Sequence, residues 1–322
     1  MINMKKFVLG LFLILLVSGC AGMPDIFKGL IPGTDNVNKT ELSPDLIVIQ
    51  NLNVIPTPPI NAGDEFSVSF EIKNQDEINE IKNVKYTLFD YGLCKKPDSG
   101  TDGTIDNFAP LQTEFKEWTF TAPQNDEIAY LPNKCPIRFK VNYTFNATSQ
   151  IDVDIISKSR LTQLQRAGTP PSFTPSLSIG RGPVKIYLSF GASLPARDNS
   201  SLPIFISVED KGSGLFKEIT NYTQSEVKSL TLKVPDDFNI SSCDKFDPRG
   251  TVSEGGVTYK LYRNKDVIPI IKKKSPQLRC SFTTPNSTAI NDLEKTYFIT
   301  ASLEYDYDIT GETTVSIKPT ST

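Results

Sequence analysis

A segment of this chain recurs at a constant spacing of 162 residues. Residues 119–123 are Thr-Phe-Thr-Ala-Pro, and residues 281–285 are Ser-Phe-Thr-Thr-Pro. A register held this long predicts two copies of one unit, and repeated units indicate display, spacing or binding before catalysis. With no gap, the same spacing aligns Ile137, Val141, Tyr143, Phe145, Val153 and Ile155 with Ile299, Leu303, Tyr305, Tyr307, Val315 and Ile317.

Apolar and polar residues alternate through both copies. Phe66, Val68, Phe70 and Ile72, for example, are separated by Ser67, Ser69 and Glu71. A period of two is typical of half-buried strands, so we predict an all-β protein of two tandem immunoglobulin-like β-sandwich domains. Further strands are expected at 45–54, 84–88, 137–145, 151–155, 184–188, 204–208, 230–234, 257–261, 297–307 and 313–317.

The predicted domains are residues 44–157 and 176–322. Between them, residues 158–175 form a linker, in which 158–166 are expected to form a short helix or a turn before Gly168, Pro170 and Pro171. The front halves align at a spacing of 136, Phe66–Asn74 with Leu202–Asp210. The second copy therefore has a longer middle within residues 220–274, and such an insertion is where the copies could differ in function.

The start of the first copy resembles the CARDB-type immunoglobulin-like domains of archaeal and bacterial surface proteins. The resemblance covers about 50 residues and rests on Pro44–Val48, the prolines at 56–59, Ala62–Asn74 and Asn83–Leu88. In the second copy it is fainter, and Asp210-Lys211-Gly212 replaces the Lys-Asn turn. The family implies extracellular adhesion or spacer modules and supplies no catalytic residues.

The first 43 residues predict export and a lipid anchor. Lys5 and Lys6 precede an apolar run at 7–17, which would rise only about 16 Å as a helix, too short for a bilayer core of about 30 Å. Val17-Ser18-Gly19-Cys20 resembles a lipobox, so residues 1–19 are expected to be a signal peptide, Cys20 the lipidated residue and residues 20–43 a flexible tether. The alternative is an ordinary signal peptide with an incidental cysteine.

Four of the five cysteines remain when Cys20 is set aside. They are distributed as Cys94 and Cys135 in the first copy and Cys243 and Cys280 in the second. In an exported chain this predicts one disulfide in each copy, closing a loop of about 40 residues and contributing roughly 4 kcal/mol. Free thiols in the core are the alternative.

The chain contains no histidine, which excludes Ser-His-Asp and Cys-His catalysis and the usual zinc enzymes. Its formal net charge is −3, without a basic face, so we expect no nucleic-acid partner. We also expect no cofactor and no metal. Several polar side chains could in principle act as calcium ligands or acid–base pairs, but we expect them to be solvated polar positions: Asp98, Asp102, Asp106 and Asn107, then Asp152 with Asp154, and Glu304 with Asp306 and Asp308.

Asn-x-Ser/Thr sequons exceed the number that composition predicts. They predict N-glycosylation of an exported surface, with chance occurrence as the alternative. A lipobox together with sequons indicates an archaeal cell surface. The sequon residues are Asn38, Asn142, Asn146, Asn199, Asn221, Asn239 and Asn286.

These features predict a non-catalytic protein on the extracellular face of the membrane, for adhesion, envelope structure or binding of an unknown surface protein or glycan. The alternative function is a solute- or glycan-binding lipoprotein, which would need a concave aromatic-lined pocket, expected in the 220–274 segment. A carboxylate-based hydrolase is a third hypothesis. Trp118, the single tryptophan, is expected in the core, with a sugar-stacking role as its alternative.

Overall fold

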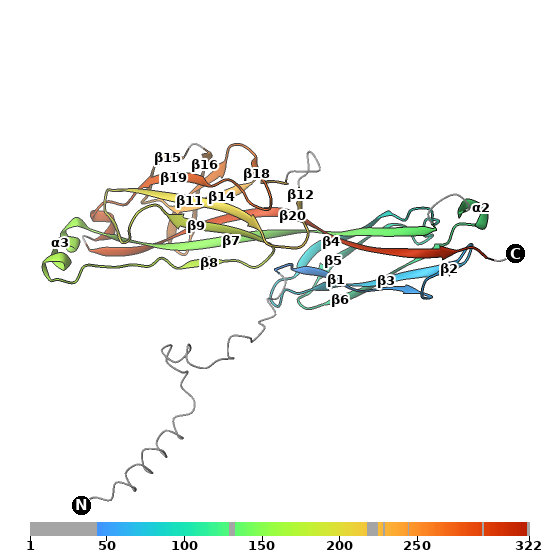
Figure 1. Ribbon diagram of the computed structural model, residues 1–322. Helices are drawn as coiled ribbons and strands as arrows, with labels where there is room; N and C mark the ends of the chain where they lie inside the picture. The colour runs from blue at the N-terminus through green and yellow to red at the C-terminus, as the bar shows by residue number, and fades with distance from the viewer. Residues whose placement is uncertain are drawn as a thin grey trace, which may run out of the picture. The chain divides into compact units, whose positions relative to one another are not determined.

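The computed structural model describes residues 44–128, 133–217, 225–227, 229–243, 245–291 and 293–320, and nearly all its elements are strands (Figure 1). The predicted all-β sandwich class is confirmed. The helices are α2 (Asn125–Ile128), α3 (Lys158–Arg166), which matches the predicted helix, and a 3-10 turn at Thr288–Ile290. Ser157 caps α3, because its hydroxyl accepts a hydrogen bond from Arg160 N.

Two very long strands dominate the fold: β7 (Lys134–Ile156) and β20 (Glu294–Lys318). They run antiparallel and side by side in Figure 1, and every residue of β7 has a partner on β20, from Lys134 opposite Ser316 to Ile156 opposite Glu294. At about 3.3 Å per residue, β7 is roughly 75 Å long.

The two ends of this ribbon belong to different sandwiches. The first sandwich packs the sheet β1 (Ile47–Ile55), β3 (Glu65–Asn74) and β6 (Thr113–Thr121) against β4 (Ile81–Asp90), β5 (Asp102–Phe108), the start of β7 and the end of β20, which also pairs with β2 (Ile60–Asn61). Across its layers, the ring centroids of Phe70 and Phe139 are 4.1 Å apart.

The second sandwich uses the other end of the ribbon. The end of β7 and the start of β20 join β8 (Leu177–Ile179), β10 (Ala196–Arg197), β12 (Leu215–Lys217), β14 (Leu230–Pro235), β16 (Phe246–Glu254) and β17 (Val257–Asn264). The facing sheet contains β9 (Val184–Phe190), β11 (Ser201–Asp210), β15 (Asn239–Ser242) and β19 (Leu278–Thr283), and β13 (Ser225–Val227) pairs with β18 (Ile268–Ile270).

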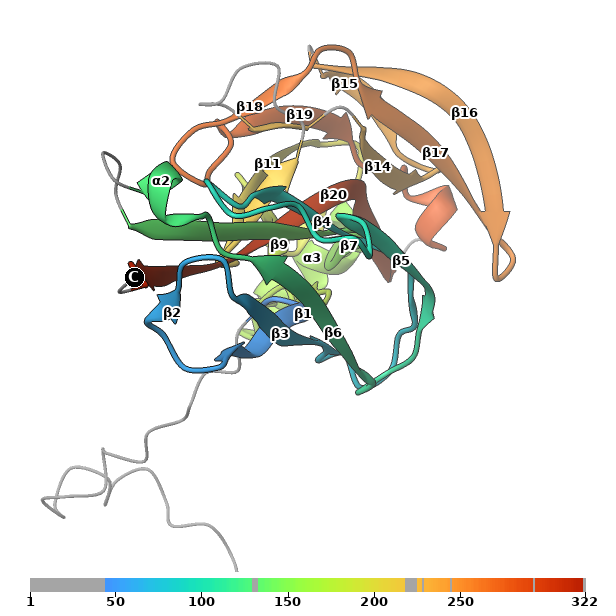
Figure 2. The ribbon, with the colours of Figure 1, turned by 90° about the vertical axis from the view of Figure 1, so that its right-hand side faces the viewer.

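One side of the ribbon serves both cores. Apart from Ile156 at its end, the buried side chains of β7 are odd-numbered residues, both in the first sandwich, such as Ile137 and Val141, and in the second, such as Ile151 and Val153. Figures 1 and 2 nevertheless show the two smaller sheets on opposite sides of the ribbon. The right-handed twist of a long two-stranded ribbon accounts for this, because it turns one face progressively around the strand axis.

The pairing of β7 with β20 gives the 162-residue spacing a structural meaning. Thr144 lies opposite Asp306, 162 residues away, and its Oγ1 donates a hydrogen bond to the Asp306 carboxylate. On either side, the Ile137–Thr313 pair corresponds to the Ile151–Ile299 pair. The repeated segments are therefore related by a local two-fold arrangement centred on Thr144 and Asp306.

Two predictions about the copies are wrong. The expected strands at 137–145 and 151–155 are one continuous strand, as are those at 297–307 and 313–317. The predicted division into domains 44–157 and 176–322, joined only by a linker, is also wrong, because the repeated segments pair in a common sheet. The cause is the unbroken β7–β20 ladder, which gives the polar stretch at 146–150 hydrogen-bond partners that no local pattern reveals.

The apolar residues that alternate along the repeated segments lie in the core, as a period of two predicts. Ile137, Val141, Tyr143, Ile299, Leu303 and Tyr305 are all buried. Ala301, the counterpart of Phe139, lies opposite Leu232 of β14, which belongs to the longer middle segment and is itself fully buried. In the first sandwich Leu88 of β4 lies opposite Phe139 in the same way, so this pairing does not set the two copies apart.

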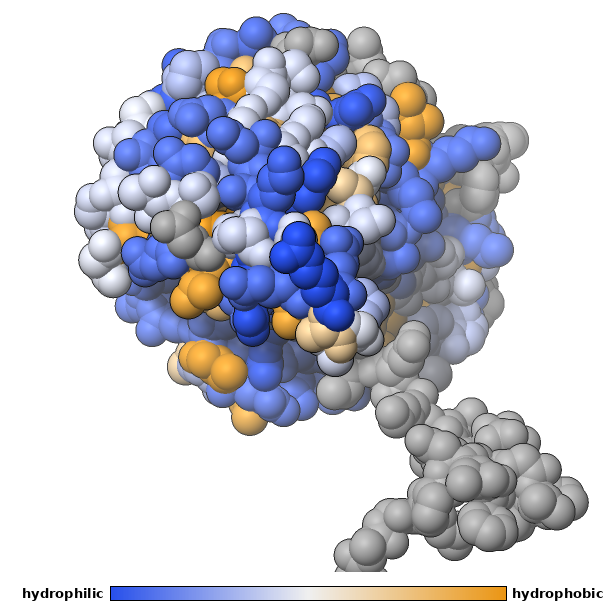
Figure 3. Space-filling view, turned by 90° about the vertical axis from the view of Figure 1, so that its left-hand side faces the viewer, coloured by the Kyte–Doolittle hydropathy of each residue, from blue (hydrophilic) through white to orange (hydrophobic). Residues whose placement is uncertain are grey.

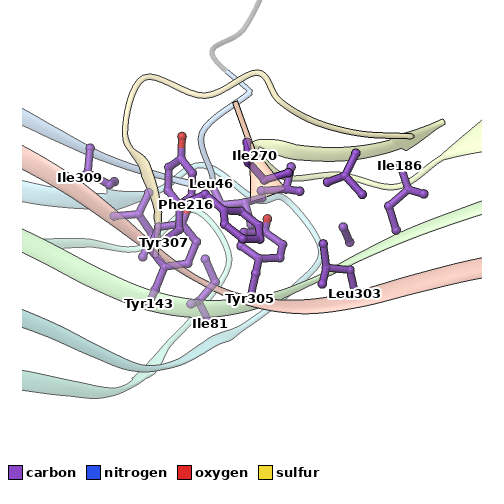
Figure 4. Packing of buried hydrophobic residues seen from close by; sticks show 14 of the residues in the cluster. Leu46, Ile81, Tyr143, Ile186, Phe216, Ile270, Leu303, Tyr305, Tyr307 and Ile309 are labelled. Carbon is purple, nitrogen blue, oxygen red and sulfur yellow. The ribbon is translucent and has the colours of Figure 1, made fainter. Parts of the chain in front are cut away.

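Aromatic rings fill the core where the ribbon passes from one sandwich to the other (Figure 4). Tyr143 and Tyr307 have centroids 5.8 Å apart, and Tyr305 stacks on Phe216 of β12 at 5.5 Å. Buried carboxylates border these rings: Asp210 accepts a hydrogen bond from Tyr307 OH at 2.9 Å, and Asp45 accepts one from Ser213 Oγ at 2.6 Å. We call Asp45, Asp210, Ser213 and Tyr307 the waist cluster.

Candidate functional site

Both predicted disulfides are present. Cys94 bonds to Cys135, which lies in β7, and Cys243 bonds to Cys280, which lies in β19. Each bridge closes its loop within one copy, as the cysteine distribution predicted. Cys20 lies outside the described residues, together with the rest of the expected signal peptide and tether.

The sequon asparagines fall into three groups. Asn146, Asn199, Asn239 and Asn286 are exposed, so their side chains are accessible for modification. Asn142 is half-buried between β4 and β20, and its amide donates a hydrogen bond to Asp308 Oδ1 at 2.8 Å. Asn38 and Asn221 lie outside the described residues. Glycosylation of these sites stays a prediction.

The carboxylates considered for chemistry do not converge. Asp98, Asp102, Asp106 and Asn107 are exposed, and the described residues contain no cluster of three or more metal-ligating side chains. Three other carboxylates, along the ribbon, accept hydrogen bonds from residues of the facing strand or of a nearby loop. Asp154 accepts from Thr296 Oγ1, Asp306 from Thr144 Oγ1, and Asp152 from Ser176 N. Glu304 is exposed.

Trp118 is a core residue. It is 4% exposed and packs against Phe70 and Phe139, with ring centroids at 4.9 and 5.3 Å. A ring enclosed in this way cannot receive a sugar, so the sugar-stacking alternative is wrong for Trp118.

The 220–274 insertion forms one wall of a surface hollow of about 430 Å³. Its lining comes from the end of β14 and the two residues after it (235–237), from the turn and first residues of β17 (256–259), and from residues near the start of β20 (295–298). We call this hollow the β14–β20 groove. The tight turn at Gly255 and Gly256, both at positive φ, reverses the chain so that β17 returns along β16 (Figure 2).

A fixed polar network occupies one side of the groove. Tyr297 OH donates to Asp237 Oδ2 at 2.8 Å, and Lys295 Nζ lies 3.5 Å from the same oxygen. Burial, followed by the neighbouring Asp237 carboxylate, raises the pKa of Tyr297, so its hydroxyl remains a donor at neutral pH. Asp236 is held by Lys260 at 3.0 Å.

Three aromatic side chains line the groove. Lys295 Nζ lies 4.5 Å from the centroid of Tyr297, and Lys233 Nζ lies 4.9 Å from that of Tyr259. The third ring, Phe298, is 46% exposed and occupies the outer phase of β20. Phe298 is therefore the most exposed of the three rings.

The groove uses residues of β20 as well as the 220–274 segment in which a pocket was expected. Alternation predicts a strand at 297–307 but gives no signal that Tyr297 and Phe298 would lie near residues 235–237. The hydrophilic colouring of the face in Figure 3, broken by small separate apolar patches, likewise follows from the tertiary structure.

The comparisons with known proteins assign no family. No family model and no curated protein matches the chain. Among solved structures, it is similar to the C-terminal globular domain of an oligosaccharyltransferase from Pyrococcus abyssi, with a TM-score of 0.24 and 10% identity over 85% of this chain and 50% of that one. It is also similar to red sea bream transglutaminase, with a TM-score of 0.19 and 11% identity over 83% and 31%.

The chain spans half or less of the length of both structures, and likenesses at these scores carry no functional argument. The longest helix among the described residues, α3, has nine residues, and none of those helices could span a membrane.

Proposed function

We propose that this chain is a non-catalytic, lipid-anchored protein of the extracellular membrane face that supports adhesion, envelope structure or partner binding. One observation carries the proposal: two disulfides use four of the five cysteines and leave Cys20. Disulfides persist in oxidising compartments, which fits export. The remaining cysteine is the one that ends the lipobox-like sequence, where a lipid would be attached.

Further support comes from residues that catalysis would need. The chain has no histidine, and Asp154, Asp306 and Asp308 of the ribbon accept hydrogen bonds from neutral hydroxyl and amide donors. The resemblance of the first copy to CARDB-type domains fits adhesion or spacing. The proposed architecture places the β-sandwiches beyond a tether of residues 20–43.

Replacing Cys20 tests the anchor. We expect Cys20→Ser to release the chain from membranes, or leave it as an unprocessed precursor, because the thioether to lipid cannot form. Membrane fractionation and mass spectrometry of the N-terminal peptide would measure this. A Cys243→Ser/Cys280→Ser double variant is the control, since it removes a disulfide but leaves lipidation intact. A Cys20→Ser chain that fractionates and migrates like the wild type would disprove the anchor.

A further inference from the structure

We propose that the β14–β20 groove binds a neutral carbohydrate, stacked on Phe298 and hydrogen-bonded to Asp237. The groove contains one exposed aromatic ring, Phe298. Phe298 is 46% exposed and lines a hollow of about 430 Å³, which is large enough for one or two sugar rings. An aromatic face of this kind suits the apolar C–H face of a sugar, because stacking removes apolar surface of both partners from water.

The groove is also lined by hydrogen-bonding groups, of which Asp237 is the central one. Asp237 uses Oδ2 for its contacts with Tyr297 and Lys295, and neither contact involves its other carboxylate oxygen. The Asp237 side chain is 41% exposed, so a ligand hydroxyl can reach it. A carboxylate fixed by a buried tyrosine and a lysine is preorganised to accept hydrogen bonds from hydroxyl groups.

The charged groups around the groove favour a neutral ligand. A cationic ligand would normally occupy the faces of Tyr297 and Tyr259, but Lys295 and Lys233 already lie over these rings. An anionic ligand would meet the carboxylates of Asp236 and Asp237, while Lys260 and Lys295 are already paired with them. A neutral, hydroxyl-rich molecule with an apolar face satisfies all of these constraints.

Binding to a glycan array tests this inference. The full chain would be purified in detergent from a host that does not N-glycosylate, so that no attached sugar occupies the groove. The array would present neutral oligosaccharides of hexose and N-acetylhexosamine units beside sialylated and sulfated ones, and calorimetry would measure the dissociation constant of the strongest neutral ligand.

We expect saturable binding of neutral glycans, weakened at least tenfold by Phe298→Ala and by Asp237→Asn. Phe115→Ala is the matched control, because Phe115 is an exposed phenylalanine on β6 of the first sandwich, and its loss should leave binding unchanged. Circular dichroism would show that each variant is folded. Binding to no glycan, preference for anionic glycans, or undiminished binding by Phe298→Ala would each overturn the inference. None of these outcomes depends on whether Cys20 carries a lipid.

Discussion

The waist cluster holds an ionisable side chain, the carboxylate of Asp210, almost entirely away from water. Asp210 is 6% exposed, and its Oδ1 accepts hydrogen bonds from Gly212 N at 3.0 Å and Tyr307 OH at 2.9 Å. Lys273 Nζ lies 4.0 Å from Oδ2, while Asp45 adds a second negative charge to the cluster. Burial is the largest effect and raises the pKa of Asp210 above its ordinary value.

Replacing Asp210 with asparagine should flatten the dependence of stability on pH. Because the folded-state pKa is raised, the stability that this carboxyl contributes is complete below its unfolded pKa near 3.9 and is lost as pH rises through the folded pKa. Asparagine keeps an acceptor oxygen but does not titrate. We expect Asp210→Asn to gain stability relative to wild type between pH 4 and 7, measured by urea unfolding. Parallel pH curves for the two proteins would contradict this.

At the scale of the element, the β7–β20 ribbon fits closely at one pair of residues. Gly311 lies opposite Phe139, and a Cβ built on Gly311 would come within 2.4 Å of that ring. The Phe139 ring cannot retreat, because Phe70 and Trp118 pack against it. Glycine at 311 thus leaves room for the large side chain at 139, whereas the equivalent pair, Ser149 and Ala301, combines two small residues.

Gly311→Val should therefore destabilise the protein by about 1–3 kcal/mol through overpacking. Chemical denaturation would measure the loss of unfolding free energy. Thr310→Ala, at the exposed position next to it, should change stability by less than about 0.5 kcal/mol. Combining Gly311→Val with Phe139→Leu should cost less than the sum of the single changes, since the smaller side chain vacates the space. Strict additivity would mean that the two residues are not in contact.

At the scale of the whole molecule, the two sandwiches are coupled through strands that they share. Residues 43–322 form one compact unit, in which β7 and β20 supply core residues at both ends. A sandwich cannot lose its end of the ribbon without disturbing a ladder that continues into the other. We therefore expect a single cooperative unfolding transition.

The single tryptophan makes this coupling measurable. Leu232→Ala removes a fully buried side chain from the second sandwich and should cost about 2–5 kcal/mol. Trp118 fluorescence reports on the first sandwich, and far-ultraviolet circular dichroism reports on all strands. We expect Leu232→Ala to lower both midpoints equally, and the exposed Leu293→Ala to lower neither. A Trp118 midpoint that stays at the wild-type value while circular dichroism shifts would show that the sandwiches unfold separately.

The sequence alone determined the features that depend on short-range patterns. Period-two alternation identified the strands and their buried phase, because neighbouring residues on a strand face opposite sides. The distribution of cysteines predicted both disulfides, and the residues around Lys158–Arg166 predicted α3. The presence of a repeat at 162 residues was also evident, although the way its copies meet was not.

The tertiary structure alone decided how the copies combine and where a groove forms. Alternation is the same whether a strand pairs with a neighbour in the chain or with one 162 residues away, so it could not show that β7 and β20 are continuous partners. The polar residues at 146–150 resemble a turn until the facing strand supplies their hydrogen bonds. For the same reason, Asp237, Tyr297 and Phe298 become one site only when β14 and β20 are adjacent.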